Sequence, residues 1–345
     1  MTRVFLMIDY RGQFYSSTKH RGAAVDLDRL RDYFTKSGFE LMIVPFSGVN
    51  FCTQNYKDEW VLYQSSEDPS LFYRGYLEDI VTGLLMQGAK LIPNFYQFKA
   101  HHNKHFMEIM RDIQSLLEIK NIQAERYGTY EDYLKNIKKF KEKTYVLKVS
   151  DTSKSKKVFL LKNLKEKIRL PKIMSRTLSL QNLKYFMKKL GTGNTPLYIS
   201  NHRQKFILQL YISNLHGDYR VVVYDNKFYV LYRTNRTNDF RASGSMKFNY
   251  DVELPTGLLD YAERVFDSFD VPYIALDVGA KDGTFYLFEF QFVCFGQYTL
   301  EKSKYFYRHD NNEWVKIFEE PDLEREIATS IIKFIRRLQV SDGRN

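Results

Sequence analysis

Two neighbouring predicted strands near the C-terminal end carry polar side chains that could bind a metal ion. In the segment YLFEFQFVCFG, residues 286–296, Glu289 and Gln291 alternate with aromatic residues. Because side chains alternate across a strand, the acid and the amide share one face, and Tyr286 and the other aromatic residues share the opposite face. In the preceding strand, residues 273–278, the same alternation separates Asp277 from an apolar face. The sequence therefore predicts a hairpin with one polar and one apolar face.

The loop that joins these two strands determines which side chains face each other. A three-residue loop, residues 282–284, places Asp277 opposite Glu289 and Ala275 opposite Gln291. Facing carboxylates repel unless a cation lies between them, and burial raises the pKa of one of them. A cluster of oxygen ligands without Cys or His suits Mg²⁺, which commonly bridges to phosphates. The alternative is a hairpin whose polar face lies in solvent.

A second predicted hairpin carries cations. The sequence DYRVVVYDNKFYVLYR, residues 218–233, indicates two strands joined by a two-residue turn. In that register Asp218 lies opposite Arg233, and Arg220 shares their face. Arg241 follows in the loop RTNDFRASGS. Guanidinium groups bind phosphates or carboxylates through two parallel hydrogen bonds, although isolated arginines on hairpins are more often ordinary surface charges.

The N-terminal part of the chain predicts a small parallel sheet. Expected helices begin after Asp26 and span residues 73–86, and they alternate with expected strands at residues 4–8, 41–45, 60–64 and 90–93. Alternation of strands and helices is typical of an α/β domain. We therefore expect a layered domain to precede the two hairpins.

The rest of the chain predicts hairpins separated by helices. Asn103 is the expected cap of a helix with one apolar face, formed by Phe106, Ile109, Met110, Ile113 and Leu117. The further expected elements are a hairpin of residues 145–149 and 158–161, a helix over 180–189, a strand over 206–212, a helix opened by Pro255, and a last helix from Asp322 to about Leu338. These elements indicate an α+β organisation.

Composition excludes several classes of protein. The chain has 345 residues, 44% of them hydrophobic, with only 8 Pro and 17 Gly, which argues for a globular protein of two or three domains rather than low complexity. No apolar stretch is long enough to span a membrane, and the N-terminal residues do not resemble a secretion signal. The two cysteines cannot form a disulfide framework, so we expect a cytoplasmic protein.

The net charge of +11 comes mostly from one segment. Residues 136–172 contain 13 Lys or Arg against 3 acids. Such a basic block attracts polyanions such as nucleic acid or a nucleoside triphosphate. The alternative explanation is the solvated face of a Lys-rich helix and hairpin.

The order of these parts resembles the ATP-grasp superfamily, whose members are mostly carboxylate–amine or carboxylate–thiol ligases. The resemblance rests on Lys148 in a strand, then FILQLYIS, DYRVVVY, YVLYR and NDFRASGS, and finally Asp277 ahead of FEFQ. It implies an α/β plus α+β fold, with a small parallel-sheet domain followed by two α+β subdomains that enclose ATP. The implied parts are a pre-ATP-grasp domain at residues 1–102 and an N-terminal ATP-grasp subdomain at 103–205. They are followed by a C-terminal subdomain with the metal site at 206–339 and a flexible tail at 340–345.

The resemblance also implies the residues that contact the nucleotide. Lys104 matches the first ATP-contacting lysine, and Lys148 matches the lysine that reaches the α- and β-phosphates. Asp218 falls near the ribose. The segment that reads adenine, mainly through backbone groups, is formed by Gln209, Leu210, Tyr211 and Ile212.

The remaining implied residues act on the phosphates and the metal. Arg233 and Arg241 match the arginines that hold the γ-phosphate and stabilise an acyl phosphate. The magnesium ligands are Asp277, Glu289 and Gln291. Two positions depart from the family pattern. Gln291 is one methylene longer than the usual Asn, and the loop over the phosphates, SDTSKSKK, is not Gly-rich.

The implied function is an ATP-dependent ligase that joins a carboxylate to an amine through an acyl phosphate. Its expected cofactors are ATP and Mg²⁺, and its expected substrates are a small-molecule or peptide carboxylate and an amine. On this hypothesis Asp277→Ala and Glu289→Ala abolish ATP turnover without unfolding the chain. The alternatives are a kinase of the same fold that phosphorylates a hydroxyl, or a basic protein that binds nucleic acid without ligase activity.

Overall fold

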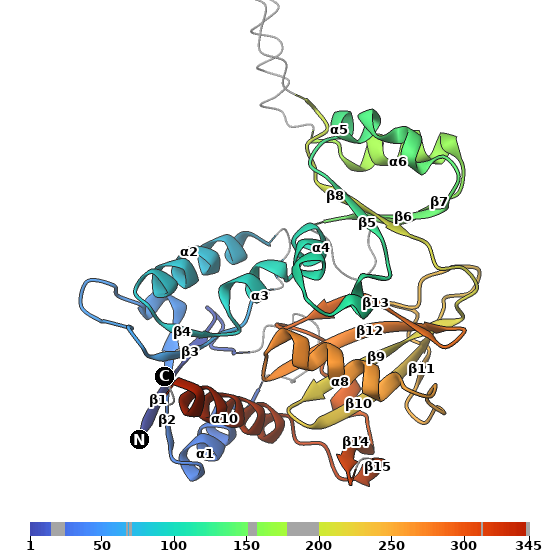
Figure 1. Cartoon of the computed structure of the whole chain (residues 1–345). Helices are drawn as coiled ribbons and strands as arrows, with labels where there is room; N and C mark the ends of the chain where they lie inside the picture. The colour runs from blue at the N-terminus through green and yellow to red at the C-terminus, as the bar shows by residue number, and fades with distance from the viewer. Residues whose placement is uncertain are drawn as a thin grey trace, which may run out of the picture. The chain divides into compact units, whose positions relative to one another are not determined.

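The chain divides into two compact units. The computed structural model describes residues 1–14, 25–66, 68, 71–150, 157–177, 200–311 and 313–342. Unit 1 joins Met1–His101 to His216–Asn345, and unit 2 is the continuous segment His102–Leu215 (Figure 1). The helix expected at residues 180–189 and the turn residues 151–156 lie outside the described ranges. No helix in those ranges is long and apolar enough to cross a membrane.

The N-terminal part of unit 1 is the expected parallel sheet. Its strands are β1 (Thr2–Ile8), β2 (Phe39–Pro45), β3 (Trp60–Leu62) and β4 (Lys90–Ile92), in the order β2-β1-β3-β4. Its helices are α1 (Leu27–Lys36), α2 (Phe72–Met86) and α3 (Phe95–Ala100), and the short helix η1 (Phe46–Gly48) follows β2. Asp26 caps α1 as predicted, because its side chain accepts hydrogen bonds from the Asp28 and Arg29 amides.

The C-terminal part of unit 1 is a larger antiparallel sheet in the order β13-β12-β9-β10-β14-β15. Its strands are β9 (Gly217–Tyr224), β10 (Lys227–Thr234), β12 (Tyr273–Lys281), β13 (Thr284–Gln291), β14 (Tyr305–Asp310) and β15 (Glu313–Phe318), and β11 (Phe248–Asn249) pairs with β10. Its helices are α8 (Leu258–Phe269), α9 (Tyr298–Glu301) and α10 (Leu323–Asp342). Both predicted hairpins therefore lie in one sheet.

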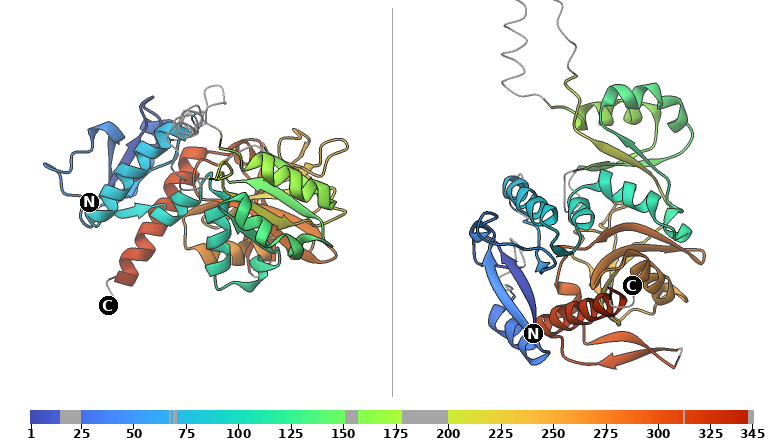
Figure 2. Two further views of the ribbon diagram at one scale, coloured as in Figure 1. Left: turned by 90° about the horizontal axis from the view of Figure 1, so that it is seen from above. Right: turned by 60° about the vertical axis from the view of Figure 1, so that its left-hand side comes forward.

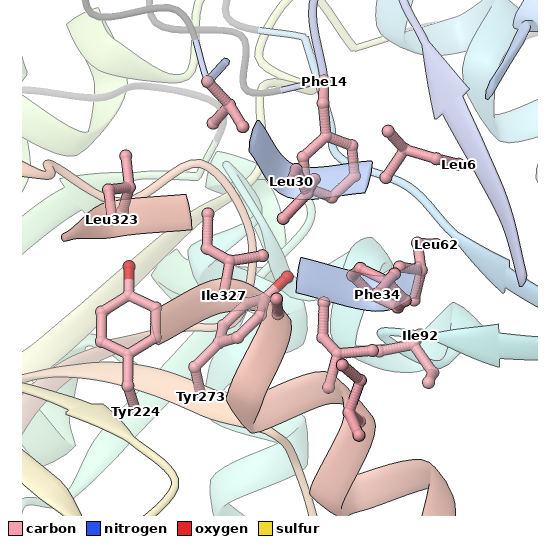
Figure 3. Close-up of a cluster of buried hydrophobic side chains, with 14 of the residues drawn as sticks. Leu6, Phe14, Leu30, Phe34, Leu62, Ile92, Tyr224, Tyr273, Leu323 and Ile327 are labelled. Carbon is pink, nitrogen blue, oxygen red and sulfur yellow. The ribbon is translucent and has the colours of Figure 1, made fainter. Parts of the chain in front are cut away.

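One hydrophobic core joins the two sheets of unit 1, and α10 contributes much of it. Figure 3 shows this core, which contains Leu6, Phe14, Leu30, Phe34, Leu62, Ile92, Tyr224, Tyr273, Leu323 and Ile327. Helix α10 also lies beside α1 (Figure 2), where Asp322 accepts a hydrogen bond from the Tyr33 hydroxyl at 2.7 Å. Residues expected to form separate domains, 1–102 and 206–339, thus share one core.

Unit 2 is an antiparallel sheet with helices. Its strands are β5 (Ala124–Tyr127), β6 (Tyr145–Val149), β7 (Val158–Leu161) and β8 (Phe206–Leu210), in the order β5-β8-β6-β7. Its helices are α4 (Lys104–Ile113), α5 (Tyr130–Lys135) and α6 (Leu164–Met174), with short helices η3 (Leu117–Lys120) and η4 (Ile137–Phe140). Because β8 pairs with β5 and β6, this unit extends past residue 205, where the sequence analysis placed a boundary.

Three helices differ from the sequence prediction. Helix α8 begins at Leu258, after a left-handed Gly257 cap, rather than at Pro255. Helix α4 ends at Ile113, whose side chain is exposed, and its buried residues include Glu108 and Arg111 instead of the expected apolar face. Helix α10 continues to Asp342, past the start of the expected tail at residue 340.

Candidate functional site

The hairpin of β12 and β13 brings the predicted polar residues together. Asp277 lies opposite Glu289 and Ala275 lies opposite Gln291, which confirms the predicted register. The predicted three-residue loop is wrong, because Lys281 pairs with Thr284 across a two-residue turn. A bulge next to Asp277 supplies the extra residue that the longer loop was expected to supply.

The bulge also changes which face some side chains occupy. Val278 pairs with Leu287, so Phe288 has no partner of its own in the ladder and the alternation shifts by one residue. Tyr286 pairs with Gly279 and lies on the face of Asp277, contrary to the prediction that it shares the apolar face. Leu287 takes the buried position instead.

The second hairpin adopts the predicted register and lies against the first. Asp218 is opposite Arg233 across the turn of β9 and β10. Strand β9 also pairs with β12, where Arg220 is opposite Asp277. The centre of the sheet thus carries alternating acids and arginines on one face. We call Asp218, Arg220, Arg233, Asp277, Glu289 and Gln291 the carboxylate–arginine cluster.

Hydrogen bonds and ion pairs connect the whole cluster. Arg233 binds Asp218 through two hydrogen bonds of 2.7 and 2.8 Å, and its Nη2 atom lies 2.8 Å from Oδ2 of Asp277. Arg220 donates from Nη1 to Oδ1 of Asp277 at 3.2 Å and from Nη2 to Oε1 of Gln291 at 3.1 Å. Gln291 donates from Nε2 to Oε1 of Glu289 at 2.9 Å. Both carboxylate oxygens of Asp277 therefore face a guanidinium group.

The charged side chains of the cluster are buried, so each ionised group is stabilised by its oppositely charged neighbours. Arg233 is 2% exposed, and Arg220, Asp277 and Asp218 are 6%, 8% and 9% exposed. Burial raises the pKa of the Asp218 carboxyl above its ordinary value, and the bound Arg233 opposes that rise. Burial lowers the pKa of Arg220 while Asp277 raises it, with a net increase, and Arg233 behaves in the same way. Both guanidinium groups are therefore cationic throughout the physiological range.

The donor set suits a hard cation that is shared with phosphates. Asp277, Glu289 and Gln291 offer only oxygen ligands, which Mg²⁺ prefers. Across the described ranges, no group of three or more His, Cys, Asp or Glu side chains is arranged to hold a metal ion. Two carboxylates and an amide do not complete the octahedral shell of Mg²⁺, so water or phosphate oxygens have to supply the remaining ligands. The cluster fits such a shared site and does not fit an all-protein cage.

Arg241 lies in the loop between β10 and β11 and binds a residue of that loop. Its Nη2 atom is 2.5 Å from Oδ2 of Asp239, and hydrogen bonding to Arg241 lowers the pKa of Asp239 below its ordinary value. In the same loop, Arg236 donates to the Ser243 carbonyl at 2.6 Å. The loop therefore has its own internal bonds, and a phosphate contact by Arg241 stays a prediction.

Unit 2 carries the two predicted lysines. Lys104 is the first residue of α4, directly after the Asn103 cap, and its side chain is buried. Lys148 lies on β6, where it pairs with Val158 on one side and Ile207 on the other. These positions agree with the expected local structure. Their contacts with a nucleotide stay a prediction.

In the segment predicted to bind adenine, residues 209–212, several polar groups form hydrogen bonds within unit 2. The Gln209 side chain donates to Glu108 at 3.2 Å. The backbone amides of Leu210 and Tyr211 donate to carbonyls of residues 123 and 144 at 2.8 and 3.1 Å. Ile212 follows as a half-buried residue. A base bound by this segment would therefore need groups other than these two amides.

In its described residues, 136–150 and 157–172, the basic block does not form a uniformly cationic face. Lys167 is buried, donates to the Lys141 carbonyl at 3.1 Å, and has its pKa lowered by burial. A cavity of about 650 Å³ is lined by both signs of charge, with Lys120, Lys138, Lys139 and Lys143 beside Asp112, Glu125 and Glu142. Acids among the lysines weaken attraction for a phosphate backbone. Nucleic-acid binding stays a prediction.

One aromatic residue beside the cluster has no sequence signal that we recognised. The guanidinium carbon of Arg220 lies 6.0 Å from the ring centroid of Tyr298, at the start of α9. Tyr298 also stacks on Phe248 of β11, with centroids 5.1 Å apart and an interplanar angle of 8°. Tertiary packing brings the Tyr298 ring to Arg220, and no local pattern in the sequence indicates it.

Comparison of the sequence finds no matching family model and no similar curated protein. Comparison of the structure finds similar folds at low sequence identity. The structure of D-cycloserine synthetase DcsG has a TM-score of 0.53 and 12% identity, over 96% of this chain and 99% of that one. A RiPP-associated ATP-grasp ligase of Chryseobacterium gregarium, in complex with ADP and a leader and core peptide, has a TM-score of 0.52 and 14% identity, over 96% of each chain. The ATP-grasp ligase PsnB, complexed with a minimal precursor, Mg and ADP, has a TM-score of 0.52 and 12% identity, over 97% of this chain and 99% of that one.

Proposed function

Because this chain has the ATP-grasp fold, as its sequence predicted, we propose that it is an ATP-dependent ligase that joins a carboxylate to an amine. The observation that carries the proposal is the carboxylate–arginine cluster on β9, β10, β12 and β13. Carboxylate and amide oxygens, which Mg²⁺ prefers as ligands, and guanidinium groups, which bind phosphates, lie there on one face of one sheet. Fold similarity alone supports only a nucleotide-binding scaffold.

The proposed reaction has two steps. A carboxylate oxygen of the substrate attacks the γ-phosphorus of ATP, which forms an acyl phosphate and releases ADP. An amine then attacks the acyl carbon, forms the amide bond, loses a proton and releases phosphate. Bound Mg²⁺ would neutralise charge on the phosphate oxygens during transfer.

The residues of this chain bind and orient the reactants. We assign Asp277 and Glu289 to the metal, and Arg233 and Arg241 to the transferred phosphoryl group. The buried position of Arg233 favours this role, because a guanidinium group fixed by Asp218 needs little reorganisation when charge develops nearby. Lys104 and Lys148 of unit 2 are assigned to the nucleotide phosphates and residues 209–212 to adenine.

We propose a peptide or another amino-acid-like molecule as the substrate. Two of the similar structures are ligases with bound peptides, described as a leader and core peptide and as a minimal precursor. Those descriptions apply to those proteins, and they suggest which substrates to test first. Phosphorylation of a hydroxyl by the same fold remains the alternative reaction.

Phosphate release from ATP, measured across a panel of carboxylates paired with amines, tests the proposal. Hydroxylamine distinguishes the two reactions, because it converts an acyl phosphate to a hydroxamate and does not react with a phosphate monoester. We expect hydroxamate formation with the wild type and its loss in Glu289→Gln. Glu313→Gln is the matched control, since Glu313 is an exposed acid of the same unit. Full phosphate release by Glu289→Gln, or no release with any substrate pair, contradicts the proposal.

A further inference from the structure

Arg220 has no role in the reaction proposed above, yet it lies at the centre of the cluster. It is 6% exposed and contacts both Asp277 and Gln291, two of the residues expected to bind metal. Its Nε atom is buried and has no hydrogen-bond partner among the residues that the structure describes. A buried cation with an unsatisfied donor is costly unless a ligand completes its surroundings.

The two arginines that contact Asp277 are anchored differently. Arg233 also binds Asp218 through two short hydrogen bonds, so it keeps an acidic partner if Asp277 binds something else. Arg220 makes its other hydrogen bond to Gln291, a neutral amide. The positive charge of Arg220 is therefore compensated mainly by Asp277 until another anion binds.

Gln291 links Arg220 to the second carboxylate. Its Oε1 accepts from Arg220 at 3.1 Å while its Nε2 donates to Glu289 at 2.9 Å. The amide group thus faces a cation on one side and an acid on the other, which is the arrangement expected of a bridge. The Gln291 side chain is one methylene longer than that of Asn, and this length suits the bridge.

From this geometry we infer that Arg220 is a positioning residue. Its guanidinium group neutralises the acidic side chains of the metal site until the nucleotide binds. Arg220 neutralises Asp277, and Gln291 holds Arg220 in place. A divalent cation binds weakly by itself, and it binds tightly together with phosphates that accept hydrogen bonds from the displaced guanidinium group. The inference rests on the proposed function and adds a coupling between the binding of metal and the binding of nucleotide.

Charge balance in the cluster supports this coupling. Three carboxylates and two guanidinium groups give one net negative charge, so a divalent cation alone leaves a buried net positive charge beside Arg220. Repulsion between cations is weakly screened in such a site. Nucleotide phosphates supply negative charge that offsets the added positive charge, so the metal and the nucleotide should each strengthen binding of the other by the same factor.

Binding of Mn²⁺, followed by the paramagnetic resonance of the free ion, tests the inference without catalysis. Wild-type protein is titrated with Mn²⁺ in the absence and presence of ADP, with correction for Mn²⁺ chelated by free ADP. We expect ADP to lower the Mn²⁺ dissociation constant by about tenfold or more. Arg220→Gln should tighten binding of Mn²⁺ alone by a similar factor, because it removes the competing cation.

A second variant and a control show whether a change in Mn²⁺ binding comes from the loss of Arg220 or from misfolding of the variant. Arg220→Met removes the guanidinium group by a different substitution and leaves the expected metal ligands in place, so it should also tighten Mn²⁺ binding without ADP. Arg29→Gln removes an arginine that is paired with Asp322 and Glu324 in the same unit, and it should leave Mn²⁺ binding unchanged. Near-ultraviolet circular dichroism checks that each variant is folded.

The outcomes separate this inference from the proposed function. Equal binding of Mn²⁺ to the wild type with and without ADP overturns the inference and leaves the ligase proposal standing. Unchanged binding of Mn²⁺ alone in both Arg220→Gln and Arg220→Met also overturns the inference. No binding of ADP or Mn²⁺ to the wild type under any condition overturns the proposed function, and the inference with it.

Discussion

Removal of the Asp277 carboxylate should destabilise unit 1, because this side chain neutralises two buried cations. In Asp277→Ala, Arg233 keeps its two hydrogen bonds to Asp218. Arg220 keeps a hydrogen bond to Gln291, which carries no charge. The structure therefore changes our expectation that Asp277→Ala leaves the fold intact.

The expected size of this effect follows from burial. Breaking a buried ion pair by removing one partner costs about 3–5 kcal/mol, and the hydrogen bond that Arg220 retains moves the expected loss to the lower end, about 3 kcal/mol. Glu289 is only half-buried and accepts a hydrogen bond from Gln291, so Glu289→Ala should cost about 1 kcal/mol. The difference between the two variants should be about 2 kcal/mol.

Urea unfolding followed by tryptophan fluorescence measures this difference in the right part of the molecule. The chain has 2 Trp, and both lie in unit 1, Trp60 on β3 and Trp314 on β15. The double variant Arg220→Met/Asp277→Ala removes the unpaired cation as well and should recover part of the lost stability. A free-energy loss in Asp277→Ala no larger than in Glu289→Ala, or a double variant less stable than Asp277→Ala, would refute the reasoning.

Two further predictions concern Gly217, which precedes Asp218 of the cluster, and Arg241, in the loop after β10. Gly217→Ala places a methyl group 2.7 Å from the Tyr232 ring and against the backbone of β10, so urea unfolding should show a loss of about 2 kcal/mol or more; Gly75→Ala, with nothing within 4 Å, should cost nothing and serves as the control. Arg241→Gln should raise the pKa of Asp239 toward its ordinary value, since Arg241 lowers it in the folded protein. Stability from this pair is present at neutral pH and is lost as the pH falls through the lowered pKa, so a carboxyl NMR titration in which the variant and the wild type agree would contradict the assignment.

The strand pairs of the cluster were predictable because they depend on local rules. An Asp-Asn turn fixes the register of β9 and β10, and alternation then sets which side chains share a face. For β12 and β13 the same reasoning predicted the right partners for Asp277 and Ala275, but it assumed the wrong loop length. A three-residue loop and a two-residue turn with a bulge both shift the register by one residue. The sequence pattern cannot distinguish them, so the face of Tyr286 was predicted incorrectly.

Helix α4 shows where local periodicity fails. The sequence favoured an apolar face that includes Ile113, but that side chain is 77% exposed. The buried face instead contains Glu108 and Arg111, which form an ion pair of 2.8 Å. Gln209 completes this pair from β8, far along the chain. A buried ion pair is stable only with such partners, and no pattern within the helix indicates them.

The shared core of unit 1 has a consequence for synthesis of the chain on the ribosome. The apolar face of α1 and the parallel sheet are completed by α10, yet residues 1–101 emerge roughly 220 residues before α10 begins at Leu323. At about 5–20 residues per second, that interval is about 10–45 s. Unit 2 is continuous and emerges whole within it. During that interval the face of the N-terminal sheet that α10 completes has no partner from the C-terminal part of unit 1.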